Sequence, residues 1–481
     1  NALKSEDTGS HNVAIGHEAL KTADAGADAY NTAVGSLAGT SVTTGIFNTI
    51  VGALAGDALT TGNNNVAIGY LALSSEDAGS NNVAIGTKAL TLMDAGADAY
   101  NVAIGHNAGL NVSTGVRNTL IGGLAGDALT TGNYNVAVGY TALGAEDNDG
   151  RNVAVGYAAL AAQNAGTAGY NTAVGFEAGL SVTTGTHNTL IGGLAGDALN
   201  SGGGNVAIGT EALSAEDGHG RNIAIGVSAL KVQDAGTNAY NIAIGYEAGV
   251  AVTTGTLNTI IGGLAGDALT TGSRNTVLGY SALSTEDTGG KAVAIGWKAL
   301  LNQNYNGDSY NVAVGYEAGQ GITTGIQNTI VGGLAGDSLT DGNNNIAIGY
   351  LALTTETSGG NNVAIGVTAL QQSNGGTYNV AIGRDSGQQV TTGDNNTLVG
   401  AESGDALTTG TQNVAIGMQA LSEEDTGSNS VAIGYRALKN QNSDSSNYNV
   451  AVGTDAGKNL TSAAAVVLVG GQAGDALTTG G

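Results

Sequence analysis

The sequence contains no cysteine and no proline among its 481 residues, and aromatic residues make up only 4% of it. Without cysteine, neither a disulfide framework nor a thiolate metal site can form. The lack of proline excludes a collagen-like chain, in spite of the 82 glycines. No run of 18 apolar residues occurs, so we expect no membrane insertion as a helix. Few large side chains are available to build a thick globular core.

Basic residues are also scarce, because 14 Lys and Arg stand against 39 Asp and Glu, for a net charge of −25. A nucleic-acid partner is therefore not expected, since such binding depends on clustered Lys and Arg. The acidic balance instead favours a soluble surface that resists non-specific association. The apolar share of 41% is too high for a disordered polar chain. Small apolar residues at fixed spacing indicate thin layers stacked on one another.

What the sequence contains is one motif, N-x-A-I-G with variants, repeated along the whole chain. Successive units start at residues 65, 82, 101, 118 and 135, so their lengths are 17 or 19 residues. A longer period of 70 residues recurs with starts at 135, 205, 275 and 345, and is two residues shorter before 413. Strict repetition of this kind predicts a solenoid in which each unit is one layer.

The alternation within a unit predicts a β-strand, because Val66 and Ile68 lie on one side and Ala67 on the other. A helix is excluded by the regular glycines and by the short length in which each unit must close. We therefore predict an all-β protein, a parallel β-solenoid or β-roll of about 28 coils of 17–19 residues. Because the first unit is incomplete, we expect residues 1–481 to be a single continuous solenoid within a longer chain.

Stacking of the coils assigns a structural role to three sets of residues. The asparagines that open the units are predicted to form a ladder of side-chain amides: Asn65, Asn82, Asn101 and Asn118. The larger residues of the strands are predicted to fill the dry interior: Val66, Ile68, Val83 and Ile85. The small residues between them would form an exposed apolar stripe unless three chains placed it on a common axis: Ala67, Ala84 and Ala103. A homotrimer follows from this interpretation.

Catalytic chemistry has little support in the sequence. The five histidines occupy no repeated position, and no G-x-S-x-G nucleophile elbow is present, so we expect neither an enzyme nor a cofactor. Carboxylates recur at two turns, and calcium prefers several oxygen ligands on a turn. The glycine-rich calcium motif of other solenoids is missing, so we expect mainly solvated acids there, with calcium as the alternative. The calcium candidates are Asp77, Asp127, Asp147 and Asp197.

The repeat also carries a resemblance to known families. The N-x-V-A-I-G-x-x-A-L unit is similar to the head repeats of trimeric autotransporter adhesins, and this implies a left-handed β-roll assembled as a trimer. The segments TTGNNNVAIGYLAL and GLAGDALTTG look more like repeats of bacteriophage tail-fibre proteins. The resemblance covers essentially the whole chain, although coils of 17 and 19 residues are longer than those of around 14 residues in adhesin heads.

From this resemblance we expect the shaft of a trimeric extracellular or virion fibre. Such a shaft positions a receptor-binding tip, outside this chain, against a host surface receptor. A bacterial cell-surface adhesin is one alternative, and it requires a secretion signal and a membrane anchor. A self-assembling surface filament is another, and it would associate end to end as the concentration rises. All three hypotheses place the protein outside the cell, on a virion or on a cell surface.

Overall fold

The computed structural model describes residues 1–6, 11–148 and 150–479. Every regular element in these residues is a three-residue β-strand, and no helix occurs among them. The chain divides into two compact units, Asn1–Tyr240 and Asn241–Gly481, which are built from the same kind of coil. Each unit is described by itself.

The strands of the first unit recur once per coil. They are β1 (Val13–Ile15), β2 (Thr32–Val34), β3 (Thr49–Val51), β4 (Val66–Ile68), β5 (Val83–Ile85), β6 (Val102–Ile104), β7 (Thr119–Ile121), β8 (Val136–Val138), β9 (Val153–Val155), β10 (Thr172–Val174), β11 (Thr189–Ile191), β12 (Val206–Ile208) and β13 (Ile223–Ile225).

The second unit continues the pattern. Its strands are β14 (Ile242–Ile244), β15 (Thr259–Ile261), β16 (Thr276–Leu278), β17 (Val293–Ile295), β18 (Val312–Val314), β19 (Thr329–Val331), β20 (Ile346–Ile348), β21 (Val363–Ile365), β22 (Val380–Ile382), β23 (Thr397–Val399), β24 (Val414–Ile416), β25 (Val431–Ile433), β26 (Val450–Val452) and β27 (Val467–Val469).

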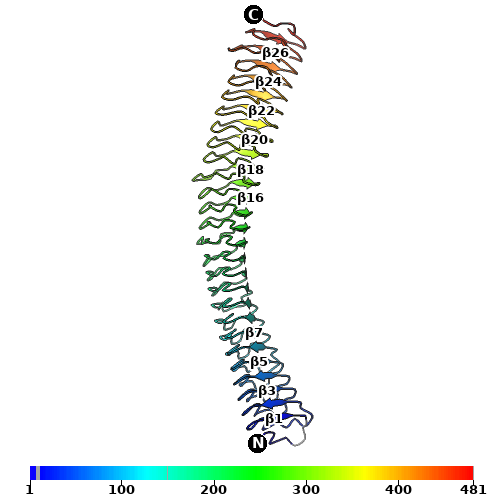
Figure 1. Ribbon diagram of the computed structural model, residues 1–481, viewed down its shortest axis with the longest axis vertical. Coiled ribbons are helices and arrows are strands. Elements are labelled where there is room, and N and C mark those ends of the chain that lie inside the picture. Colours follow the sequence, from blue (N-terminus) through cyan, green and yellow to red (C-terminus); the bar gives the residue numbers. More distant parts are fainter. Residues whose placement is uncertain (7–10, 149, 480–481) are drawn as a thin grey trace. The chain divides into compact units, whose positions relative to one another are not determined.

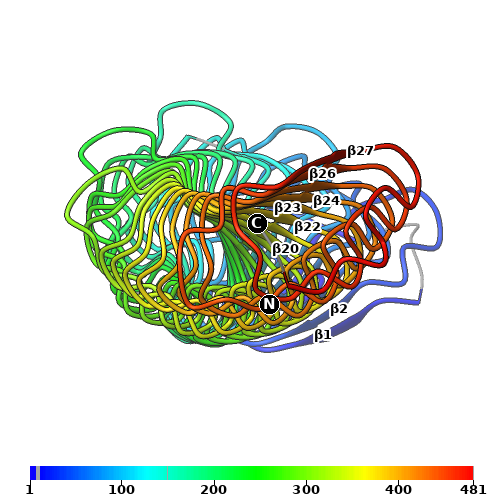
Figure 2. The same cartoon turned by 90° about the horizontal axis from the view of Figure 1, so that it is seen from above.

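Within each unit, every strand pairs in parallel with the strand of the next coil. The register joins equivalent residues, as in Val66 with Val83, Ala67 with Ala84 and Ile68 with Ile85. Figure 1 shows the strand arrows of each unit stacked one above another, and Figure 2 shows the coils as flattened loops seen along the stack. The predicted parallel β-solenoid is therefore confirmed, with about 27 turns.

The interior of each coil is occupied by the middle residue of the strand. Ala67, Ala84 and Ala103 are at most 1% exposed. The residues on either side, such as Val66 and Ile68, point outward and are half-buried. The coil is flat, so the strand centre is either a small residue or a larger one that faces a small residue on the opposite wall.

The predicted assignment of inner and outer residues is therefore wrong. The predicted interior residues lie on the outer face: Val66, Ile68, Val83 and Ile85. The predicted axis residues are enclosed within their own coils and cannot line an axis between chains: Ala67, Ala84 and Ala103. Strand alternation distinguishes two faces but does not say which one is enclosed.

The 70-residue period follows from how four successive coils share the interior. In the coils of Ala67 and Ala84 the following turn supplies a fully buried leucine, Leu73 and Leu90. In the coil of Ala103 the same position is Gly109, where an added Cβ would lie 2.7 Å from a Leu120 methyl group. In the coil of β7 the strand centre is instead Leu120. The turn there has Gly126, where an added Cβ would lie 2.8 Å from a Leu120 methyl group. Large and small residues thus compensate in volume from coil to coil, as close packing requires.

Glycine is required at the end of each strand. Gly122 has φ +136°, and a Cβ on it would lie 2.4 Å from the carbonyl oxygen of Gly139 in the next coil. Any larger residue would have to adopt an unfavourable backbone conformation, and its Cβ would clash with a carbonyl oxygen that is fixed in the next strand. This close approach explains why the motif ends in glycine in every complete unit.

The asparagines that open the units form a buried ladder, but its bonds run through the backbone. The N–H of Asn82 donates to Oδ1 of Asn65 at 3.0 Å, and Asn101 does the same to Asn82 at 3.1 Å. Nδ2 of Asn65 donates to the Gly79 carbonyl at 2.9 Å. Asn118 continues the ladder through its N–H to Oδ1 of Asn101 at 2.9 Å. Each side chain therefore joins the strand start to its own coil and to the next one.

The predicted amide-to-amide ladder is thus corrected to a ladder of amides and backbone groups. The reason is that a buried backbone N–H needs an acceptor just where the chain enters the strand. The asparagine Oδ1 of the preceding coil lies at that point and supplies it.

Candidate functional site

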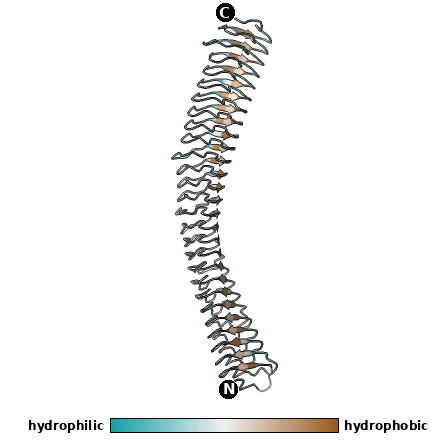
Figure 3. Cartoon of the chain, viewed as in Figure 1, coloured by the Kyte–Doolittle hydropathy of each residue, from teal (hydrophilic) through white to brown (hydrophobic). Residues whose placement is uncertain are grey.

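An uncharged outer face is the first feature that could contact a partner. The outward residues of β1 to β13, two per strand, are all Val, Ile or Thr. Those of β14 to β27 are Val, Ile, Leu or Thr. We call these two columns of side chains, within each unit, the apolar strip. Figure 3 shows its strands coloured as hydrophobic against more polar loops.

Aromatic side chains border the apolar strip just after the strand-ending glycines. Tyr140 and Tyr157 stack with their ring centroids 5.9 Å apart, and Phe176 continues the stack at 5.3 Å from Tyr157. In the second unit Trp297 stacks on Tyr316 at 4.9 Å. These rings are exposed, between 36% and 55% for the five residues. Exposed aromatic residues beside a continuous apolar face are typical of interaction surfaces.

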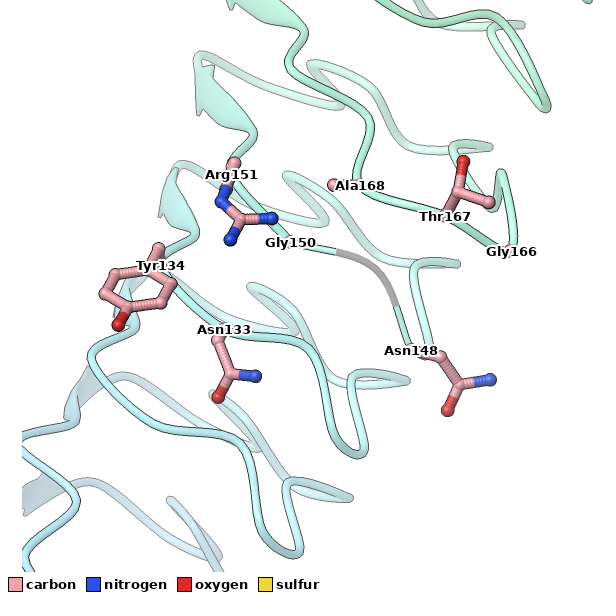
Figure 4. A pocket seen from close by; sticks show the side chains of 8 residues that line it. All are labelled: Asn133, Tyr134, Asn148, Gly150, Arg151, Gly166, Thr167 and Ala168. Atoms are coloured by element: carbon pink, nitrogen blue, oxygen red, sulfur yellow. The ribbon is translucent and has the colours of Figure 1, made fainter.

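The opposite border of the strip is formed by the residue that precedes each ladder asparagine. This position has a left-handed conformation, with φ +59° at Arg117, +62° at Tyr134 and +66° at Arg151. Aromatic and basic side chains alternate here in part of the first unit, and a hollow of about 250 Å³ lies beside Tyr134 and Arg151 (Figure 4).

A second functional element is a set of fully buried glutamates, which recurs with the 70-residue period. One oxygen of Glu76 accepts the N–H of Gly79 at 2.6 Å, and the other accepts that of Ala95 in the next coil at 3.3 Å. The equivalent residues are Glu146, Glu216, Glu286, Glu356 and Glu424, all at 0% exposure. They are not the solvated turn acids that we expected.

The buried glutamates anchor the turn of the longer coil that follows them. Glu286 accepts hydrogen bonds from Gly289 N at 2.7 Å, from Gln303 Nε2 at 3.0 Å and from Tyr305 N at 3.2 Å. Gln303 in turn accepts a bond from Asn311 of the asparagine ladder at 2.8 Å. The carboxylate therefore links the inserted residues of the 19-residue coil to the ladder.

Burial raises the pKa of Glu76, Glu216 and Glu286, while the hydrogen bonds to their carboxylates act in the opposite direction. Loss of water outweighs the bonds in each case. Burial therefore disfavours ionisation of these glutamates, and the hydrogen bonds that anchor the turn offset part of that effect.

A third set of acids lies in the turn after every fourth strand. Burial raises the pKa of Asp57, Asp127 and Asp197, and it raises that of Asp405 to about 6, with Glu402 among the further causes. Oδ1 of Asp405 is buried and accepts no hydrogen bond. These aspartates are half-buried, and few hydrogen bonds offset the loss of water around their carboxylates, whereas the glutamates accept several.

The calcium candidates separate in the structure. Asp77 lies in a group with Glu76 and Asp94, whose oxygens are within 4.8 Å of one another. Asp127, Asp147 and Asp197 belong to no such group within the described part of the chain. A related group contains His219 and the acids Glu216, Asp217 and Asp234. Calcium needs six to eight oxygen ligands, and three carboxylate residues supply only part of that number.

No protein-family model matches the chain, and no curated protein matches it significantly. Within the described residues, no helix is long and apolar enough to cross a membrane.

Sequence reasoning missed the buried glutamates, although a signal for them was present. The glutamate recurs in all seven equivalent turns of the sequence, from Glu6 to Glu424, whereas the next residue is Asp in six of them and Thr357 in the other. A residue that stays constant while its neighbour varies between internal repeats is typical of a buried position. The net acidic charge concealed this, because acids on turns are usually solvated.

Proposed function

We propose that the chain is the shaft of a homotrimeric extracellular or virion fibre, in which the apolar strips of three chains pack together. The role is structural, and the mechanism is the positioning of a receptor-binding tip that lies outside this chain. A host surface receptor would be bound by that tip.

The observation that carries the proposal is the apolar strip. A charged residue is absent from all the outward strand positions of the first unit, and its 13 strands make a stack about 60 Å tall. An apolar surface of this length, if left in water, favours association. A closed cyclic arrangement covers it equally in every chain and leaves no free face for further growth. The number three rests on the resemblance of the repeat to trimeric adhesin heads.

The repeated contacts between coils support a structural role for the chain. Each coil is bonded to the next through its strand and, at most positions, through the asparagine ladder, and the buried glutamates add a further link once in about four coils. The same contacts recur throughout both units, so no coil depends on distant parts of the chain. A stack of this kind holds the two ends of a unit at a fixed distance from each other.

The test is the mass of the protein in solution. Sedimentation equilibrium at neutral pH should give three times the 46.8 kDa of the single chain. Lysine at Ile68, Ile85 and Ile104 should convert the trimer to a monomer, because three buried charges would oppose packing of the strips. Lysine at the exposed loop residues Ala97, Thr237 and Asn302 is the matched control and should leave the trimer intact.

Other masses would revise the proposal in defined ways. A monomeric wild type would refute it. A dimer would refute the trimer while retaining the strip as the interface. A mass that grows steadily with concentration would favour the self-assembling filament.

A further inference from the structure

A cluster of one histidine and three carboxylates joins two successive coils in the first unit. Glu216, Asp217 and His219 lie in the turn after β12, and Asp234 lies after β13, in the 19-residue coil that follows. One nitrogen or oxygen atom from each of the four side chains lies within 4.8 Å of the others. The cluster therefore combines an imidazole nitrogen with carboxylate oxygens, which are ligand types that zinc accepts.

The imidazole nitrogen that faces the carboxylates has no hydrogen-bond partner. Nδ1 of His219 is buried and forms no hydrogen bond, and it lies 3.5 Å from Oε1 of Glu216. Two ligand atoms of a tetrahedral zinc ion are about 3.4 Å apart, because each bond to the metal is about 2.1 Å long. These two atoms thus already have the spacing of neighbouring ligands. A buried nitrogen without a hydrogen bond requires an explanation, and ligation of a metal ion supplies one.

The carboxylate of Glu216 is held less tightly than its equivalent in the second unit. Its Oε1 accepts the N–H of His219 at 3.1 Å, and its Oε2 accepts Nε2 of Gln233 at 3.4 Å. The corresponding distances at Glu286 are 2.7 and 3.0 Å. Burial raises the pKa of Glu216, and the nearby charge of Asp234 raises it further. Carboxylates that oppose each other in this way favour a cation between them.

The histidine distinguishes this turn from the equivalent turn one period earlier. Gly79 stands there in the place of His219, and a Cβ on it would lie 2.4 Å from Cδ of Glu76. A larger residue therefore requires the turn to adjust, and the bond from this backbone N–H to the glutamate is 3.1 Å at His219 but 2.6 Å at Gly79. The group around Glu76 and Asp94 contains carboxylates alone. It serves as an internal comparison for the cluster with the histidine.

We propose that His219, Glu216, Asp217 and Asp234 bind one zinc ion between the two coils. Nδ1 of His219 and one oxygen of each carboxylate would complete the four-coordinate shell that zinc prefers. Calcium is disfavoured, because it takes six to eight ligands and all of them are oxygen. The ion would fasten the turn at 216–219 to the coil of β13. All four residues come from one chain, so this inference does not depend on trimer formation, which sedimentation measures separately.

Isothermal titration calorimetry of the metal-free full chain with zinc chloride tests the proposal. One zinc ion should bind per chain, and the affinity should fall at least tenfold in His219→Gly and in Asp234→Asn. Each variant introduces a residue type that another repeat carries at the same position, at Gly79 and at Asn304, so both should fold. Equal melting temperatures of the metal-free proteins check this. Zinc should raise the melting temperature of the wild type and much less that of either variant.

Two further variants separate this site from adventitious binding. His187→Ala removes an exposed histidine that belongs to no such group in the described part of the chain, and Asp94→Asn changes the corresponding acid of the group without a histidine. Both should leave the affinity unchanged. The proposal is overturned if zinc does not bind saturably, if His219→Gly binds it as tightly as the wild type, or if Asp94→Asn weakens binding as much as Asp234→Asn. Displacement of zinc by an equal concentration of calcium would also overturn it, because the site would then act through oxygen ligands alone.

Discussion

The two sides of each strand obey different rules, although they alternate along the same three residues. On the inner side, the volume of the side chain determines which residue fits. Ala67 is enclosed next to Leu73, whereas Leu120 is enclosed next to glycines. On the outer side, Val66 and Ile68 are half-buried, and the shared property is the absence of charge rather than a fixed volume. The inner side therefore specifies the coil, and the outer side is the surface on which we propose that the chains pack together.

We expect the largest loss of stability from a substitution on the inner side, at a strand-ending glycine that closely approaches the backbone of the next coil. Gly122→Ala should lower the free energy of unfolding by about 3 kcal/mol or more, because its Cβ would meet a backbone oxygen at 2.4 Å in a disfavoured conformation. The adjacent Gly123→Ala is the control, since its nearest contact would be an ordinary 3.4 Å to the Tyr140 ring. Urea denaturation of both variants measures the contrast. Equal losses would show that the close approach of coils is not limiting.

Truncation of one inward and one outward side chain of β7 should lower the free energy of unfolding by different amounts. Leu120→Ala should cost about 3 kcal/mol, because it opens a cavity beside Gly126 of its own coil and Gly109 of the preceding coil, neither of which has a side chain to fill it. Ile121→Ala, one residue on, should cost about 1 kcal/mol or less in the single chain, because its side chain is half-exposed. Denaturation under conditions that keep the chain monomeric compares them. The assignment of inner and outer sides fails if the order is reversed.

The same contrast applies to neighbouring acids of one turn. Glu286→Ala should cost about 2 kcal/mol, since Gly289, Gln303 and Tyr305 would lose their acceptor inside the coil. Asp287→Ala should change stability by less than about 0.5 kcal/mol, because the hydrogen bonds from Thr270 and Thr271 go to the backbone carbonyl of Asp287, which alanine retains. Hydrogen exchange of the amides in the 302–309 turn should accelerate only in the first variant. Equal exchange in both would contradict the anchoring role.

Much of the fold was predictable because each sequence repeat forms one coil of the solenoid. The length of the units, the single strand per coil and the parallel pairing all follow from the spacing of N-x-A-I-G. The side assignment was not predictable from alternation alone, because Val66 and Ala67 are both apolar and either could face inward. The compensation between Leu120 and Gly126 would have resolved it, since glycine opposite a large residue implies a narrow interior.

The surface sites were less predictable than the coil. The contacts of Arg117 with Tyr134 and of Arg151 with Tyr170 join residues 17 or 19 positions apart, which become neighbours only when the coils are in register. The buried glutamates depend on where the chain folds back inside the turn. Neither arrangement is encoded in a local motif, so composition and spacing could indicate only the candidates.

The smallest predicted effect concerns Asp405, the aspartate whose burial without a partner at Oδ1 contrasts with the bonded glutamates. Its pKa is raised from 3.8 to about 6 in the folded chain, so folding favours the protonated form. The resulting cost is absent below pH 4, grows between pH 4 and about 6, and is complete above that range. Asp405→Asn should therefore stabilise the protein by about 1 kcal/mol at pH 7.5, allowing for solvent screening, and by nothing measurable at pH 4.

Asp337→Asn is the matched control for that measurement, because the Thr354 hydroxyl already donates to Asp337 and an asparagine oxygen can replace the acceptor. It should leave the stability nearly unchanged at both pH values. Urea midpoints at pH 4 and pH 7.5 for the three proteins complete the test. A gain from Asp405→Asn that is equal at both pH values would show that packing, rather than the charge of an uncompensated acid, sets the stability of this turn.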